Sequence, residues 1–257
     1  METAKREMTF WLADPERRLL VATAKRLPKS IMPDHLSGIG VFGAALTGVG
    51  YAMSGSGTGW LWIASVGLFL NWFGDSLDGT LARVRKMERP RYGYYLDHMI
   101  DALSTAMVGI GIGLSPYVNL PAALVLVVVY LMLSINVYLE SNTIGVFKMA
   151  YGRVGPTEGR IVLVLGNTAL VLLGGLVNVA VVNAIVISVV TGMFVMLSVR
   201  VGKNLHYLAS LEPAKPKAQV EKVAVGGGEA VSVSPASPQF ASARVRSQRQ
   251  VVLTPRP

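Results

Sequence analysis

The sequence predicts an all-α integral membrane protein with six transmembrane helices in three hairpins, preceded by an interfacial amphipathic helix. Two observations lead to this prediction. Hydrophobic residues make up 52% of the 257 residues and charged residues only 15%, whereas about a quarter of a soluble domain is charged. In addition, residues 36–74, 102–139 and 161–199 contain no Asp, Glu, Lys or Arg. Each of these stretches is about twice the roughly 20 apolar residues that span a bilayer as a helix.

Each charge-free stretch has a turn sequence near its middle. Residues 54–59, 115–119 and 174–178 are rich in Gly, Ser, Pro or Asn, and these residue types favour turns. Each stretch is therefore predicted to fold as two spans joined by a short turn. The six predicted spans are 36–54, 59–86, 93–114, 118–141, 158–176 and 180–203.

Basic residues lie at the opposite ends of the predicted spans, at the bases of the hairpins. They include Lys25, Arg26 and Lys29, the segment from Arg83 to Arg91, Lys148, Arg153 and Arg160, and Arg200 and Lys203. By the positive-inside rule this face is cytoplasmic, and both termini are expected on it. The net charge of +9 is therefore attributed to anionic lipid of the bilayer, and no nucleic acid partner is expected.

The regions before and after the spans have a different character. Asp14-Pro15-Glu16 is typical of a helix start, with Asp as the cap, and predicts a short amphipathic helix over 15–27 at the membrane surface. After His206 the chain is rich in Pro, Ser, Gly and Val, which predicts disorder. The predicted organisation is thus an N-terminal region 1–30, a six-span domain 31–206 and a disordered basic tail 207–257.

Four aspartates recur at helical spacing on the two sides of a predicted turn at 88–90. Asp75 and Asp78 share one face of the second span near its cytoplasmic end, and Asp97 and Asp101 share one face of the third. A tight turn makes these spans antiparallel, so the four carboxylates are expected to converge. Ionisable groups at this depth are costly and usually functional. A hard divalent cation, Mg²⁺ or Mn²⁺, would cancel their repulsion through oxygen ligands.

Small and basic residues accompany the aspartates. Gly79 and Ala82 lie on the same side of the second span and would let a nucleotide approach the helix backbone. Arg83 follows one turn later and can fork onto a phosphate. An alternative interpretation is a cluster of solvated helix ends paired with Arg83, Arg85 and Lys86, but it does not explain four aspartates at matched spacing.

Residues 75–101 resemble the signature of the CDP-alcohol phosphotransferase family, D-x2-D-G-x2-A-R-x8-G-x3-D-x3-D. The fixed positions are matched by Asp75, Asp78, Gly79, Ala82, Arg83, Gly93, Asp97 and Asp101. Nine residues separate Arg83 from Gly93 where eight is commonest, and this difference falls in the predicted turn. The six-span architecture is also that of the family.

The resemblance implies a role for each of these residues. Asp75, Asp78 and Asp97 would be metal ligands, and Asp101 would lie beside the metal as the catalytic general base. The CDP moiety would contact Gly79, Ala82, Arg83, Asp78, Gly93 and Ser37. The preferred reaction is transfer of a phosphatidyl group from CDP-diacylglycerol to a polar alcohol, with release of CMP, in phospholipid biosynthesis.

Other interpretations of the signature are weighed against this one. A CDP-linked choline or ethanolamine could instead donate to a lipid alcohol, because both arrangements place CDP on the same residues. A metal-cation transporter would leave Gly79, Ala82 and Arg83 without a role. A membrane prenyltransferase would lack the Asp-Gly-x-x-Ala-Arg core. The resemblance also implies a homodimer, and Gly109, Gly111 and Gly113 would permit close helix packing within or between subunits.

Two further segments are candidates for ligand binding. Pro33-Asp34-His35-Leu36-Ser37 resembles the family's Pro-Asn-x-Leu-Thr segment near the nucleotide, with Asp in place of Asn, and a helix cap would explain it equally well. Thr157, Glu158 and Arg160 open the fifth span and, with Arg153, are candidates for binding a polyol or a phosphorylated alcohol.

Two aromatic features are given simpler interpretations. His98 lies about 100° around the helix from Asp97, so it need not face the metal. Trp60, Trp62 and Trp72 are interpreted as lipid-facing residues at span ends.

Overall fold

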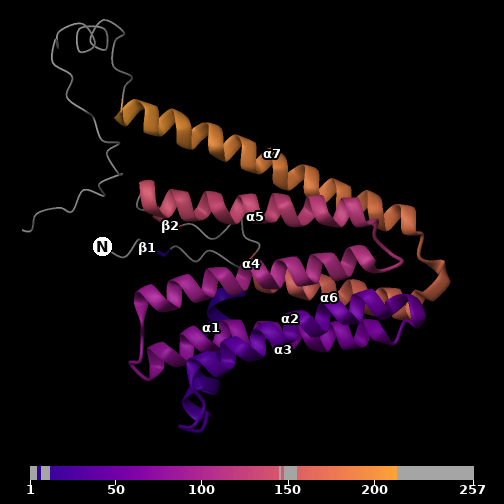
Figure 1. The fold of residues 1–257 in the computed structure, drawn as a ribbon, viewed down its shortest axis with the longest axis horizontal. Coiled ribbons are helices and arrows are strands. Elements are labelled where there is room, and N and C mark those ends of the chain that lie inside the picture. The colour runs from indigo at the N-terminus through magenta and orange to yellow at the C-terminus, as the bar shows by residue number, and fades with distance from the viewer. Residues whose placement is uncertain (1–4, 7–11, 145, 148–154, 213–257) are drawn as a thin grey trace, which may run out of the picture. The chain divides into compact units, whose positions relative to one another are not determined.

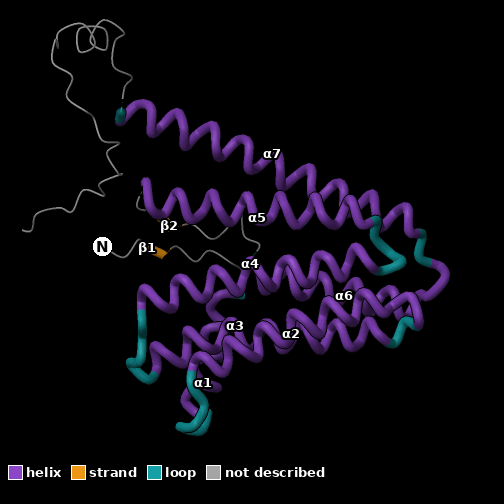
Figure 2. The backbone as a smooth tube through the Cα atoms, viewed as in Figure 1, coloured by secondary structure: helices purple, strands orange, loops and turns teal. Residues whose placement is uncertain are grey.

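The structure is a computed structural model that describes residues 5–6, 12–144, 146–147 and 155–212. Over these residues helices dominate (Figures 1 and 2), which confirms the predicted all-helical class. The helices are α1 (Ala13–Arg26), α2 (Pro33–Met53), α3 (Trp60–Val84), α4 (Pro90–Leu114), α5 (Leu120–Thr143), α6 (Pro156–Leu173) and α7 (Val179–Leu211). Two extended pairs of residues, β1 (Lys5–Arg6) and β2 (Val146–Phe147), form a short parallel pairing that the sequence did not predict.

The helix bounds lie close to the predicted ones because proline starts several helices. Pro33, Pro90 and Pro156 are the first residues of α2, α4 and α6, where the missing N–H is not needed. The end of α7 differs, since it continues to Leu211 beyond the predicted end at 203. Residues 207–211 of the predicted tail are therefore helical. The tail from 213 onward lies outside the described residues.

Within the described part of the chain, four helical segments are long and apolar enough to cross a membrane. They are Pro33–Ser56, Leu120–Thr143, Pro156–Leu173 and Val179–Leu211. The two remaining long helices, α3 and α4, have 25 residues each and carry the charged signature residues in the half nearest their shared turn. The four apolar segments indicate an integral membrane protein.

Helix α2 lies in backbone contact with α3 and α4. A Cβ added to Gly43 would lie 2.3 Å from the backbone nitrogen of Asn71, and one added to Gly111 would lie 2.4 Å from a backbone oxygen of α2. Only glycine allows helices to approach this closely. Gly109 and Gly113, on the same helix as Gly111, face side chains of α5. The glycines predicted to permit close packing therefore do so within one chain.

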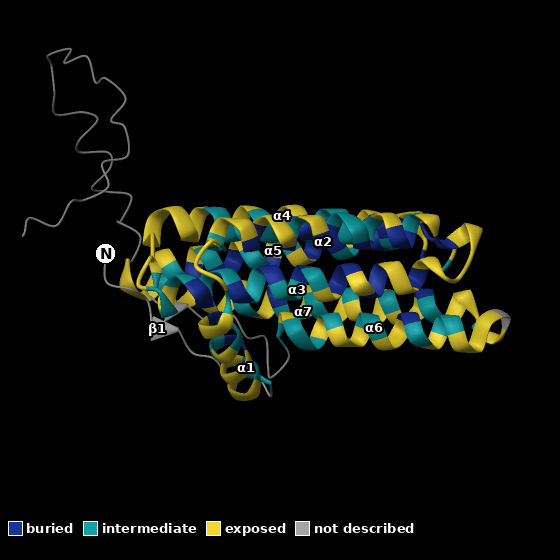
Figure 3. Cartoon of the chain, turned by 90° about the horizontal axis from the view of Figure 1, so that it is seen from below, coloured by how far each residue is buried: buried dark blue, intermediate teal, exposed yellow. Residues whose placement is uncertain are grey.

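Helices α6 and α7 are much more exposed than α2 and α3 (Figure 3). The buried residue of α6 is Asn167, and those of α7 are Asn183 and Leu197. Large apolar side chains cover the rest of both helices, and Leu165 and Leu172 are 63% and 74% exposed. A helix that is apolar on all sides is typical of a membrane span.

Polar contacts near both ends of α7 hold it against the chain. Glu140 of α5, whose side chain is 7% exposed, accepts hydrogen bonds from Nε and Nη2 of Arg200. The same carboxylate accepts bonds from Asn204 at 2.5 Å and from Asn136 at 2.9 Å. Towards the other end of α7, Asn183 hydrogen-bonds the backbone of the α4–α5 turn.

Helix α1 packs on the end of α3 that carries Asp75 and Asp78. Its buried Leu20 and Ala24 share a hydrophobic cluster with Leu36, Leu77 and Leu81. Arg85, directly after α3, also binds the segment that follows α1, because its guanidinium donates to the backbone oxygens of residues 27, 28 and 31. The predicted Asp14 cap is wrong, since α1 begins at Ala13 and its N-cap residue is Leu12.

Candidate active site

The α3–α4 hairpin brings the four aspartates of the signature together. Asp75 and Asp78 come from α3, and Asp97 and Asp101 come from α4. Asp75 interacts electrostatically with Asp97 and Asp101, and Asp78 does so with Asp75 and Asp97. The carboxyl groups therefore converge, as the helical spacing predicts.

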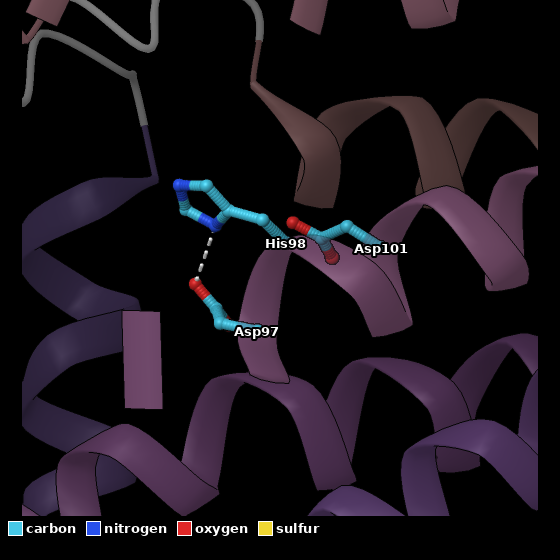
Figure 4. A group of neighbouring side chains, drawn as sticks. All are labelled: Asp97, His98 and Asp101. Carbon is cyan, nitrogen blue, oxygen red and sulfur yellow. Dashed lines mark ion pairs between the residues drawn. The ribbon is translucent and has the colours of Figure 1, made fainter. Parts of the chain in front are cut away.

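Asp97, His98 and Asp101 form the tightest group of potential metal ligands among the described residues (Figure 4). One ligand atom from each lies within 4.8 Å of the others. Nδ1 of His98 lies 3.4 Å from Oδ2 of Asp97. The imidazole ring contacts the rings of Tyr94 and Tyr138, at centroid distances of 4.1 and 4.2 Å. The spacing within α4 did not require His98 to lie here, and Tyr138 of α5 holds it in place.

Asp75 is paired with a cation from a distant part of the sequence. Nη2 of Arg160, in the first turns of α6, donates to Oδ2 of Asp75 at 2.9 Å, and its Nε donates to Oδ1 of Asn71 at 3.0 Å. Both ion-pair side chains are largely buried, at 18% and 19% exposed. Asn71 in turn donates to the backbone oxygen of Gly40 at 3.0 Å. Arg160, predicted only as an acceptor contact, therefore lies directly against the aspartate cluster.

Asp78 is fixed from α2. Its Oδ2 accepts a hydrogen bond of 2.6 Å from the hydroxyl of Ser37. Ser37 was weighed as a helix cap, but its hydroxyl instead reaches across to α3. This contact places Ser37 against a signature aspartate, and the position of segment 33–37 near the nucleotide stays a prediction.

Three of the predicted nucleotide residues, Gly79, Ala82 and Arg83, lie within about one turn of α3. The guanidinium of Arg83 donates to Thr80 at 3.2 Å. A Cβ added to Gly79 would lie 3.5 Å from Nη1 of the same guanidinium. Ala82 is half-buried. Gly93, at the start of α4, would have no heavy atom within 4 Å of an added Cβ, so open space adjoins it.

Two cations near the α3–α4 turn are bound to other parts of the chain. Arg85 binds the backbone oxygens of residues 27, 28 and 31, and Arg89 pairs with Asp34 at the start of α2. That hydrogen bond favours the charged form and raises the pKa of the Arg89 guanidinium. Arg89 therefore ties the α3–α4 turn to α2, away from the four aspartates.

The candidate acceptor residues at the start of α6 have other contacts. Glu158 accepts from the backbone N–H groups of Gly155 at 2.9 Å and Leu12 at 3.3 Å, which is typical of a capping interaction. The hydroxyl of Thr157 donates to Glu16 at 2.9 Å. Arg153 lies outside the described residues.

Glu16 is a residue that sequence reasoning missed. Its Oε1 accepts from Nε1 of Trp72 at 2.6 Å, from Thr157, and more weakly from Ser76 at 3.5 Å. The sequence predicted Glu16 only as part of the start of a helix, and Trp72 as a lipid-facing residue. No local pattern signals a contact between residues that lie 56 positions apart.

Residues 31–201 match the CDP-alcohol phosphatidyltransferase family. The chain belongs to this family. The matched region includes all four aspartates and α2 to α6, whereas α1 lies before it. No curated protein matches the chain.

Membership identifies the chain as a transferase of phosphate groups that acts with a CDP-alcohol. The donor set of the site fits a divalent cation, because two carboxylates and one imidazole of α4 can each place a ligand atom within 4.8 Å of the others. Oxygen ligands suit Mg²⁺ and Mn²⁺, and imidazole is also a ligand for first-row metals. The chain therefore has a candidate metal site at the turn-proximal end of α4, beside the aspartates of α3.

Proposed function

We propose that this phosphatidyltransferase transfers a phosphatidyl group from CDP-diacylglycerol to a polar alcohol and releases CMP. The observation that supports this most strongly is the group of Asp97, His98 and Asp101 facing Asp75 and Asp78 across the α3–α4 hairpin. The exposed apolar helices around the site suit a lipid-linked donor.

The proposed topology has six spans, α2 to α7, with the aspartate cluster on the cytoplasmic side. The four apolar segments support it, and so do the lengths of α3 and α4, since about 20 residues suffice to cross a bilayer. Basic residues near the ends of these helices favour the cytoplasmic assignment. We place α1 at the cytoplasmic interface, and expect a homodimer from the family resemblance.

Asp75, Asp78, Asp97 and Asp101 would hold the Mg²⁺ or Mn²⁺ ion. When bound, the ion supplies positive charge to the diphosphate of the donor and to the departing CMP. Ser37 keeps the carboxylate of Asp78 oriented through its 2.6 Å hydrogen bond. Arg160 orients Asp75 in the same way.

Gly79, Ala82 and Gly93 would leave room for the CDP moiety, and Arg83 would contact a phosphate. The open space beside Gly93 and the position of the Arg83 guanidinium next to Gly79 support this assignment. A fork-shaped guanidinium can donate two parallel hydrogen bonds to phosphate oxygens.

Asp101 would act as the general base. As the hydroxyl oxygen of the acceptor attacks the β-phosphorus, Asp101 takes the hydroxyl proton. The new P–O bond forms while the bond from the β-phosphorus to the CMP oxygen breaks, and CMP leaves with that electron pair. Thr157 and Arg160, at the mouth of the cluster, would contact the acceptor, and the cationic Arg160 would suit a phosphorylated alcohol.

The test is CMP release by the purified protein in lipid-containing detergent, with CDP-diacylglycerol and either Mg²⁺ or Mn²⁺. Inositol, inositol phosphate, glycerol phosphate, serine and choline would be compared as acceptors. We expect release that depends on one acceptor and that falls about 10²- to 10⁴-fold in Asp101→Asn, the range for loss of a general base. Asp14→Asn, which removes an exposed carboxylate of α1, is the matched control and should retain activity.

Binding measurements separate the possible outcomes. Titration calorimetry with Mn²⁺ should show binding that is weakened in Asp97→Asn. Binding of CDP-diacylglycerol without turnover on any acceptor, but turnover of CDP-choline or CDP-ethanolamine with diacylglycerol, would replace the proposal by the reversed donor arrangement. Failure to bind any CDP compound would refute both.

A further inference from the structure

Helix α1 has two faces of opposite character. Leu20 and Ala24 are buried against α3, and Glu16 on the same side reaches Trp72 and Thr157. Residues two positions away from Leu20, such as Arg18 and Ala22, lie about 160° around the helix and are exposed. The inward face is therefore fixed by packing, while the outward face is left for another partner.

Residues of α1 also line an open hollow of about 770 Å³ on the surface. Its described lining residues are Asp14, Arg17, Arg18, Val21, Ala22, Lys25 and Arg26. Four of these side chains are cationic and one is anionic. Because all four cations are exposed, the hollow presents a concentrated positive charge.

We propose that the hollow on the outer face of α1 binds the phosphate-bearing headgroup of an anionic phospholipid in the cytoplasmic leaflet. Charge complementarity favours this occupant, since basic clusters beside a bilayer attract anionic lipid. An apolar side chain accompanies the charge, because Leu19 is 56% exposed and projects between the two faces. Leu19 would rest at the boundary of headgroups and acyl chains while the cations hold the phosphate.

The site is separate from the aspartate cluster. Arg18, Lys25 and Arg26 lie on the side of α1 away from the buried Leu20, whereas Arg17 lies beside the buried face. Helix α1 also lies before the region that matches the family. The inference uses the interfacial position of α1 proposed above, but not the transfer reaction. Failure of the lipid-binding proposal would therefore leave the proposed activity intact. Failure of the proposed activity would likewise leave lipid binding at α1 intact.

The test counts bound lipid on the purified full-length protein. The protein in detergent is titrated with phosphatidylglycerol or with phosphatidylcholine of the same acyl chains, and retained lipid is counted by native mass spectrometry. The test variant is R17Q/R18Q/K25Q/R26Q. The matched control, K222Q/R244Q/R246Q/R249Q, removes the same charge from the C-terminal segment. Thermal unfolding and CMP release are recorded for all three proteins.

The wild-type protein and the C-terminal variant should retain phosphatidylglycerol in preference to phosphatidylcholine. The α1 variant should lose this preference, with affinity falling roughly fivefold per cation removed, and single R18Q should show a smaller loss without unfolding. Equal retention by the α1 variant, or loss confined to the C-terminal variant, would overturn the proposal. Displacement of the lipid by inorganic phosphate at equal concentration would also overturn it, because the site would then bind free phosphate.

Discussion

The α2–α3–α4 region and the α6–α7 region of this member of the CDP-alcohol phosphatidyltransferase family are held in place by different forces. In the first, the backbone of α2 touches those of α3 and α4 through glycines, and the aspartates project from α3 and α4. In the second, large apolar side chains face outward, and a few polar side chains make the contacts that fix position. The contrast teaches that the region carrying the chemistry is defined by steric fit, whereas the outer region is positioned by charge and hydrogen bonds.

The largest expected effect comes from adding a methyl group where the helices touch. In Gly43→Ala the new Cβ would lie 2.3 Å from backbone nitrogen, and backbone cannot yield as a side-chain end can. We expect a loss of about 3 kcal/mol or more, at the upper end for overpacking, and a Tm lower by about 10 °C in detergent.

The same substitution in the outer region is the control for that prediction. Gly166 of α6 has no heavy atom within 4 Å of an added Cβ, so Gly166→Ala meets no obstacle. Because alanine favours helices over glycine by about 1 kcal/mol, this variant should unfold at an equal or slightly higher temperature. Equal destabilisation by both substitutions would contradict the contrast between the regions.

The second prediction concerns the attachment of α7. Glu140→Ala removes the carboxylate that pairs with Arg200. The largely buried guanidinium of Arg200 then lacks this opposite charge. Breaking a buried pair on one side costs about 3 kcal/mol or slightly more, and the loss should appear as a lower Tm. Asn204→Ala removes one neutral donor from the same carboxylate and should cost about 1.5 kcal/mol, the lower end for a hydrogen bond to a charged group. A similar loss of Tm in the two variants would show that the charge pair contributes no more to stability than one neutral donor.

The sequence predicted local features of both regions but not the contacts between distant residues. Helical periodicity, prolines and turn residues predicted all seven helices, and the i, i+3 and i, i+4 spacing predicted the convergence of Asp75, Asp78, Asp97 and Asp101. These are local properties of the chain. The pairs Glu140–Arg200 and Asp75–Arg160 join helices 60 and 85 residues apart, and no spacing rule links such positions. Sequence alone therefore described the elements of the outer region but not its attachments.

The third prediction tests whether the outer region supports catalysis through Arg160. Its Nε and Nη2 bond Asn71 and Asp75 together, which a lysine ammonium cannot reproduce in the same geometry. Arg160→Lys should therefore retain the fold and lower kcat about a hundredfold, equivalent to about 2.7 kcal/mol of barrier. CMP release and Tm measured on the same preparation separate these quantities. Unchanged kcat with a raised acceptor KM would limit Arg160 to acceptor binding.

The smallest effect is expected at Glu16, where α1 joins α3 and α6. The Oε1 atom of Glu16 accepts hydrogen bonds from Trp72 and Thr157, so Glu16→Ala removes a shared acceptor and frees the start of α6. Loss of hydrogen bonds to one charged group costs about 1.5 kcal/mol. We expect a Tm lower by a few degrees, a shift in tryptophan emission, and a raised acceptor KM with little change in kcat.

Glu16→Gln is the matched control because it keeps a carbonyl oxygen at the acceptor position while removing the charge. It should retain most of the stability and the wild-type KM. If Gln and Ala are equally damaging, the charge of Glu16 matters more than its geometry, and α1 would be held electrostatically. If neither changes KM, α1 only covers α3, and the mouth of the site is formed by α6 alone. The comparison between these two substitutions therefore decides whether the region outside the family match takes part in recognition of the acceptor.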